Sequence, residues 1–164
     1  MAEELVPAHA GSWGRAYPNV TGGCEQRIGT LNPLLNQTYD IVRQVFEEVF
    51  ELFPDEYVHA GADEVTAECY WQVKDIAARL AQQGEWAVMP ELMQRFMDFV
   101  FGLFAKAGKR PIIWQDLMEM GLRVNPGKVL IQPWKCVPDI KCGLADLLRN
   151  GHSTIQSTCF YLGS

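Results

Sequence analysis

The sequence has no excess of positive charge. Its 164 residues include 14 Lys and Arg against 20 Asp and Glu, a formal net charge of -6. A nucleic-acid-binding protein needs a basic face for the phosphates, and a membrane-surface protein needs a basic cluster. A long apolar run is also missing, because Asp98, Gly102 and Lys106 interrupt the richest stretch, residues 96–107. We therefore expect no nucleic-acid partner and no membrane insertion.

The five cysteines form no Cys-x-x-Cys pair, and their spacing does not suggest zinc. No glycine-rich phosphate loop follows the first predicted strand. We therefore expect neither a metal nor a cofactor. The count alone leaves free thiols and a disulfide both open. Residues 1–5 lack the pattern of a signal peptide, so any secretory address is expected outside this chain. The sequons at Asn19 and Asn36 permit N-glycosylation if the chain is secreted.

Apolar residues at spacings of three and four predict an amphipathic helix over residues 36–53, ended by Pro54. We predict further helices over 73–83, closed by Gly84, from Pro90 to Gly108, and over 138–150. Residues 7–33 are rich in Gly, Pro, Asn and Ser, which favours a long loop.

Four short runs predict strands, over residues 57–61, 111–114, 129–134 and 153–161. Strands that alternate with helices indicate an α/β fold with a parallel sheet. A doubly wound sheet and part of a (β/α)8 barrel both fit this order. No linker divides the chain, so we treat residues 1–164 as one domain.

Asp63 and Glu64 follow the first predicted strand directly, after Ala60-Gly61-Ala62. Ligands of parallel α/β folds gather at the carboxyl ends of strands. Neighbouring, partly buried carboxyls repel each other, which raises at least one pKa and allows acid and base catalysis. A solvated acidic turn is the alternative for any single Asp-Glu pair.

Aromatic residues stand at the ends of the other predicted strands, at Trp114, Trp134 and Tyr161. Sugar rings pack on such side chains, so we predict a sugar-binding pocket, with core packing as the alternative. His9 lies in the long loop, where it orients a carboxylate or serves the loop alone. We expect His59 to be structural and His152 to lie at the surface.

Six ordered motifs resemble the family 20 glycoside hydrolases, the β-N-acetylhexosaminidases. His59-Ala-Gly-Ala-Asp-Glu64 resembles the family's His-x-Gly-Gly-Asp-Glu, and Pro7-Ala-His-Ala-Gly-Ser-Trp-Gly14 resembles its histidine loop. The other four motifs are Gly29-Thr-Leu-Asn-Pro33, Ile113-Trp-Gln-Asp116, Pro133-Trp-Lys135 and Phe160-Tyr-Leu162. The resemblance covers nearly the whole chain and implies part of a TIM-type (β/α)8 barrel, from about strand 3 or 4 to strand 7.

The resemblance also implies roles. The acetamido group of the substrate is the nucleophile in this family. Glu64 would then be the acid and base, Asp63 would orient the acetamido group, and Tyr161 would bond its oxygen. Trp114 and Trp134 would line the pocket, with His9 in the supporting network.

Further properties follow from the resemblance, which is closest to the lysosomal and secreted eukaryotic branch. It implies a Cys24–Cys69 disulfide and a glycan at Asn36. The chain departs from the family at Ala8 and Ala62, where the family has glycine, and at Leu5 and Gly163, where it has aspartate. A full barrel needs roughly 250 residues. Three explanations are therefore open: a fragment of a longer enzyme, a second copy or a complementary chain that completes the barrel, or a relic that serves as a structural subunit.

We therefore expect a retaining exo-β-N-acetylhexosaminidase that acts on glycans ending in N-acetylglucosamine or N-acetylgalactosamine. The departures at Leu5 and Gly163 motivate an alternative, a catalytically degenerate carbohydrate-binding or structural subunit. A different α/β hydrolase is a third reading, which would require that the six motifs do not cluster in the fold.

Overall fold

The computed structural model describes residues 30–135 and 143–158. In that part of the chain, four strands form one parallel sheet in chain order. They are β1 (Tyr57–His59), β2 (Arg110–Trp114), β3 (Leu130–Gln132) and β4 (Ser153–Thr154). Tyr57 pairs with Arg110, Ile112 with Leu130, and Leu130 with Ser153. The prediction of an α/β fold with a parallel sheet is confirmed.

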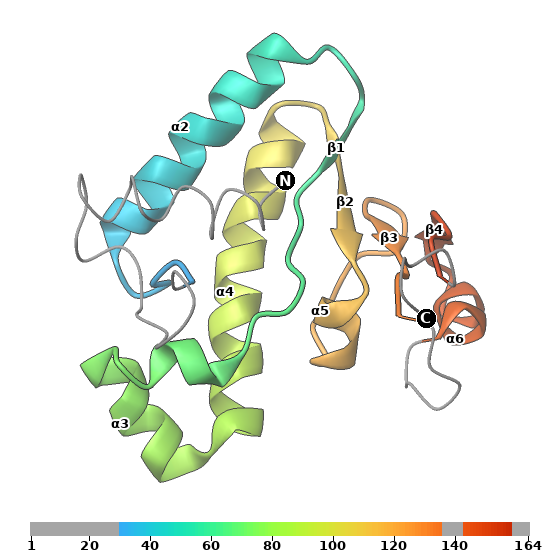
Figure 1. Ribbon diagram of the computed structural model, residues 1–164. Coiled ribbons are helices and arrows are strands. Elements are labelled where there is room, and N and C mark those ends of the chain that lie inside the picture. The colour runs from blue at the N-terminus through green and yellow to red at the C-terminus, as the bar shows by residue number, and fades with distance from the viewer. Residues whose placement is uncertain (1–29, 136–142, 159–164) are drawn as a thin grey trace.

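Helices connect and cover these strands (Figure 1). They are α2 (Asn36–Leu52), the 3-10 helix η1 (Ala67–Tyr70), α3 (Lys74–Gln83), α4 (Glu85–Lys106), α5 (Asp116–Glu119) and α6 (Leu144–Arg149). Helices α2 and α4 run beside each other on one side of β1 and β2, and α6 lies beside β4. In the described ranges, no helix combines the length and apolarity needed to cross a membrane.

The core lies between α2, α4 and the sheet. Phe104 of α4 is fully buried, as are Ile113 of β2 and Ile131 of β3. The Phe104 ring meets the rings of Phe46 and Phe50 on α2 edge-on, at centroid distances of 5.2 and 4.8 Å. Burying one such side chain contributes about 1.5–3 kcal/mol. This packing therefore fixes α2 and α4 against β2, whose carboxyl end is Trp114.

Pro90 does not open the second long helix, contrary to the prediction. Helix α4 begins at Glu85, directly after Gly84, whose φ of 80° turns the chain between α3 and α4. Pro90 lies inside the helix and removes one backbone hydrogen bond, at a cost of about 3 kcal/mol. The first turns persist because Val88 and Met89 are buried in the cluster that packs α4 on α3.

The structure corrects two expectations at the last strand. Of the strand predicted over 153–161, residues 159–161 lie outside the described residues, and β4 takes only two of residues 153–158. The amide of Ile155 still donates to the Ile131 carbonyl at 3.0 Å. His152 is not at the surface, since only 6% of it is exposed. Gly151, with φ 80°, reverses the chain after α6 and lets the His152 amide donate to the Leu147 carbonyl, which draws the ring inward.

Candidate active site at the carboxyl edge of the sheet

The turn after β1, residues 61–64, is called the acid turn below. Its first residues continue the pairing of β1 with β2. The Ala60 amide donates to the Ile112 carbonyl at 2.7 Å, and the Trp114 amide donates to the Gly61 carbonyl at 3.0 Å. The acid turn is therefore anchored to the carboxyl end of β2, as the position of Asp63 and Glu64 in the sequence predicts.

The backbone of the acid turn is strained. Gly61, Ala62 and Glu64 have φ angles of 71°, 76° and 48°. Glycine adopts this left-handed region freely, but an L side chain costs about 1–2 kcal/mol there. Such strain persists only where the surroundings hold it, and it gathers at functional sites. The turn leaves Asp63 half-buried and exposes Glu64, so a substrate can reach Glu64 from solvent.

His59 supports the acid turn from within β1. Its Nδ1 accepts the Gly61 amide hydrogen at 2.9 Å, and its ring lies 4.6 Å from the ring of Trp114. Burial lowers the pKa of His59 to about 4. The ring is therefore neutral, and Nδ1 remains an acceptor, over most of the pH range in which an enzyme works. His59 has the structural part expected of it, although its ring lies against a predicted pocket residue.

Asp116, at the start of α5, joins three neighbours. Its Oδ1 accepts the Glu64 amide hydrogen at 3.3 Å and the Lys135 ammonium at 2.8 Å. Its Oδ2 accepts the indole Nε1–H of Trp134 at 2.8 Å. Only 8% of the Asp116 side chain is exposed. A buried carboxylate is tolerated when it is paired and hydrogen-bonded, and this one is.

Lys135 neutralises two acids of α5. Its ammonium also contacts Glu119 Oε2 at 2.6 Å and lies over the Trp134 ring at 5.4 Å. Burial alone would lower the pKa of Lys135, but its hydrogen bonds to Asp116 and Glu119 and their charges raise it. The ammonium therefore stays charged, and the group Asp116–Lys135–Glu119 carries a net charge of one negative unit.

Gln115 completes the connection between β2 and β3. It is almost fully buried. Its Oε1 accepts the amide hydrogens of Trp134 and Lys135 at 2.8 and 3.0 Å, and its Nε2 donates to Glu119 at 2.6 Å. One side chain thus fixes the backbone that carries both Trp134 and Lys135.

The structure brings Asp63, Glu64, Trp114 and Trp134 to one edge of the sheet, as the strand-end argument predicts. Sequence analysis included Asp116 and Lys135 in two of the six motifs but assigned them no role. The signal was available, because residues that follow adjacent parallel strands meet at one edge. The sequence alone did not predict which of these side chains bond to each other.

Four predicted residues lie outside the described residues, namely His9, Asn19, Cys24 and Tyr161. Asn36 is the first residue of α2 and is exposed. Cys69 is buried and disulfide-bonded. Its partner is outside the described ranges, so the pairing with Cys24 stays a prediction. In residues 30–135 and 143–158, no group of three or more His, Cys, Asp or Glu could hold a metal ion.

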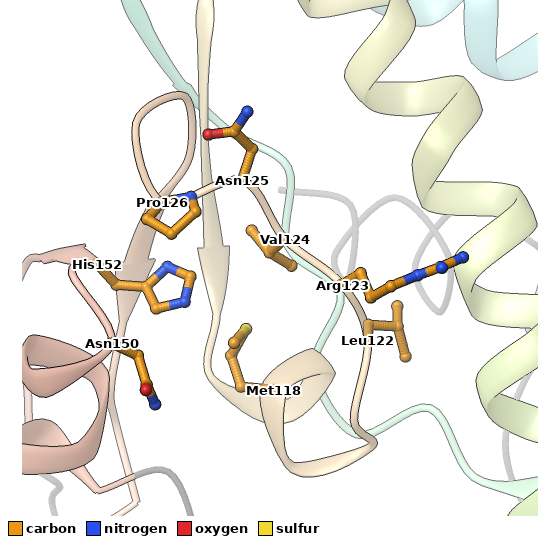
Figure 2. Close-up of a pocket in the computed structure, with 8 residues that line it drawn as sticks. All are labelled: Met118, Leu122, Arg123, Val124, Asn125, Pro126, Asn150 and His152. Carbon is orange, nitrogen blue, oxygen red and sulfur yellow. The ribbon is translucent and has the colours of Figure 1, made fainter.

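A hollow of about 700 Å³ lies elsewhere (Figure 2). It is formed by α5, the segment that precedes β3 and the turn that precedes β4, and His152 and Met118 face it from opposite sides. The segments before β3 and β4 lie at the amino ends of these strands, opposite to the acid turn. None of the predicted site residues lines this hollow.

The fold and the site define a class. A carboxylate pair and two tryptophans stand at the carboxyl edge of a parallel (β/α) sheet, which is where barrel enzymes bind their substrates. All residues from 1 to 164 match the family described as "Glycosyl hydrolase family 20, catalytic domain". The chain belongs to this family, and its parallel units form part of a TIM-type barrel.

Known proteins of this family give the same picture. The chain is 29% identical over 168 residues to beta-hexosaminidase subunit beta of Sus scrofa, covering 99% of this chain and 31% of that protein. The human subunit beta is also 29% identical over 170 residues, with 99% and 30% covered. A crystal structure of the GH20 exo beta-N-acetylglucosaminidase from Vibrio harveyi, in complex with N-acetylglucosamine, superposes with a TM-score of 0.67 at 26% identity. The superposition covers 92% of this chain and 24% of the Vibrio harveyi chain.

The chain therefore spans about a third of the length of the curated relatives it matches. The shared part contains the acid turn and the ends of β2 and β3.

Proposed function

We propose that this chain carries the part of an exo-β-N-acetylhexosaminidase active site that contains the acid turn. The enzyme hydrolyses terminal N-acetylglucosamine or N-acetylgalactosamine with retention of configuration. The observation that carries this proposal is the position of the acid turn. Asp63 and Glu64 follow β1 at the edge of the sheet where Trp114 ends β2 and Trp134 follows β3. Asp116 accepts hydrogen bonds from the Glu64 amide and from the Trp134 indole. Family membership supports the substrate class.

The geometry suits substrate-assisted catalysis, in which the acetamido oxygen of the sugar attacks the anomeric carbon. In this proposal Glu64 protonates the departing glycosidic oxygen, and it later removes a proton from the water that opens the cyclic intermediate. Asp63 accepts the acetamido N–H and stabilises the positive charge that develops there. Exposure of Glu64 agrees with its exchange of protons with substrate and water, while the more buried Asp63 agrees with an orienting role.

Trp134 and Trp114 form the apolar walls for the sugar ring and the acetamido methyl group. The indole of Trp134 is held by Asp116, and that of Trp114 lies against the neutral His59 ring. Both rings are thus fixed before the substrate arrives, which lowers the entropy lost on binding. His9 and Tyr161 belong to the same proposal through the family motifs alone.

Hydrolysis of a fluorogenic N-acetyl-β-glucosaminide by the purified chain tests the proposal. Glu64→Gln removes the acid and should lower kcat by about 100-fold or more. Glu68→Gln is the matched control, because Glu68 is exposed on η1 four residues further along. Equal activity of wild type and Glu64→Gln would contradict the proposal.

An oxazoline-like thiazoline inhibitor separates an enzyme from a degenerate sugar-binding subunit. An enzyme should bind this analogue at least about 100-fold more tightly than N-acetylglucosamine, since it resembles the intermediate. A binding subunit would hold both with similar affinity. Isothermal titration of both ligands gives this ratio without any turnover.

We also propose a lysosomal or secreted location, supported by the disulfide at Cys69 and the exposed sequon at Asn36. Non-reducing peptide mapping should find the Cys24–Cys69 bridge, and two free thiols would refute it. A second copy or a complementary chain should pair with the sheet, because β1 and β4 each pair with one strand within the described residues. Sedimentation of the purified chain measures this association.

A further inference from the structure

The contacts of Asp116 point to a role beyond charge pairing. Its two carboxylate oxygens bond in different directions, Oδ1 to the backbone of the acid turn and Oδ2 to the indole of Trp134. These two partners follow different strands, β1 and β3, and α5 follows the strand between them. Asp116 therefore connects the two outer parts of this edge.

We propose that Asp116 is a positioning residue that sets the distance between the acid turn and the Trp134 wall, with Lys135 as its ion-pair partner. The inference rests on the proposed function, since it assigns Asp116 to that same site. A carboxylate is needed because both partners are donors. An asparagine of the same shape has one acceptor oxygen, and its NH2 group would face one of the two donors.

Lys135 makes this arrangement stable. Burying a carboxylate is costly unless a cation pairs with it and donors bond to it. The ammonium lies 2.8 Å from Oδ1 and is itself held by Glu119 at 2.6 Å. Gln115 fixes the backbone amide of Lys135, so the cation is placed by a hydrogen bond independent of Asp116.

The consequence for catalysis is a coupled effect on kcat and KM. Displacing Glu64 by about 1 Å can cost about 100-fold in rate, and loosening Trp134 weakens the binding of the sugar. Asp116→Asn should therefore lower kcat by about 100-fold and also raise KM. Trp134→Phe removes one of the two donors to Asp116 but keeps the carboxylate, so it should raise KM and lower kcat less than Asp116→Asn does.

Asp116→Asn in the 164-residue chain is the test, with Asp75→Asn as its matched control, because Asp75 is exposed on α3. The kinetic constants are measured per active site, counted by titration with the thiazoline inhibitor. A second readout is hydrogen exchange at the Trp134 indole in protein labelled with 15N-tryptophan, assigned with Trp134→Phe. Loss of the bond to Asp116 should speed this exchange about tenfold, and Asp75→Asn should leave it unchanged.

The outcomes are distinct. Faster indole exchange together with a lower kcat per site supports the inference, whereas unchanged exchange overturns it. Unchanged kcat and KM per active site would also overturn it, because Asp116 would then serve folding alone. If the wild-type chain does not hydrolyse the substrate, the proposed function fails for this chain, and the exchange rate still decides the inference. If Asp116→Asn does not fold, Lys135→Gln replaces it, with about threefold faster exchange expected and no change counting against the inference.

Discussion

The turns after β1 and β2 hold acidic residues in opposite ways. The acid turn has three residues with positive φ and leaves Glu64 exposed. The turn after β2 enters α5 with regular helical geometry, and its Asp116 is buried and paired with Lys135. Strain and exposure therefore belong to Glu64, the carboxyl group that we propose to react. Regular structure and charge pairing belong to Asp116, which we propose to support it.

Removing the cation that pairs with the two acids of α5 should have the largest effect on the free energy of unfolding. Lys135→Met leaves Asp116 and Glu119 without their shared ammonium, and breaking such a pair costs about 3 kcal/mol. Urea unfolding measures the loss, with Lys128→Met at an exposed position as the control. A loss below about 1 kcal/mol would mean that water, not Lys135, compensates Asp116.

Low pH should destabilise the protein at the acid turn, through protonation of His59. Its pKa is lowered to about 4 by burial, so the folded state prefers the neutral ring. The stabilisation is complete above the unfolded pKa of about 6.5 and is lost as the pH falls toward 4. The loss should be about 2 kcal/mol, after discounting for the partial exposure of the ring.

His59→Asn isolates this contribution, because an amide oxygen can still accept the Gly61 amide hydrogen but does not titrate. Unfolding free energies of wild type and variant, measured from pH 7 to 4.5, should converge as the pH falls. Curves that stay parallel would show that the histidine does not titrate with unfolding.

The bond between Asp116 and Trp134, which follows β3, should contribute less to stability. Trp134→Phe keeps the aromatic surface but removes the indole N–H that Asp116 accepts at 2.8 Å. One hydrogen bond to a charged group is worth about 1.5 kcal/mol. Trp71→Phe, at a tryptophan that is 52% exposed, gives the control. Equal losses in the two variants would assign the effect to ring size.

Much of the regular structure could be predicted from the sequence. Helix α2 ends one residue before the predicted boundary, β2 begins one residue before its predicted run, and the other three strands lie within theirs. Apolar periodicity is local, so it survives without knowledge of the fold. The prediction that Pro90 opens a helix failed because buried residues earlier in α4 outweigh the hydrogen bond that Pro90 removes. Burial is not visible in one sequence.

The candidate site divides in the same way. Asp63, Glu64, Trp114 and Trp134 were predicted from strand ends and family motifs. The contacts of Asp116 could not be predicted, because they depend on the register that sets Trp114 opposite Gln132. His152 was placed wrongly, since its burial follows from the turn at Gly151 and the packing below it.

Ala62 gives the smallest and sharpest test of the strained turn, where the family motif has glycine. Its φ of 76° is unfavourable for alanine, so Ala62→Gly should raise the unfolding free energy by about 1 kcal/mol. The same change at Ala78, which is exposed within α3, should lower it by about 1 kcal/mol, because glycine weakens a helix. Opposite signs for one chemical change would locate the strain in the acid turn. A loss at both positions would show that the Ala62 methyl contributes more by packing against the core than its backbone costs.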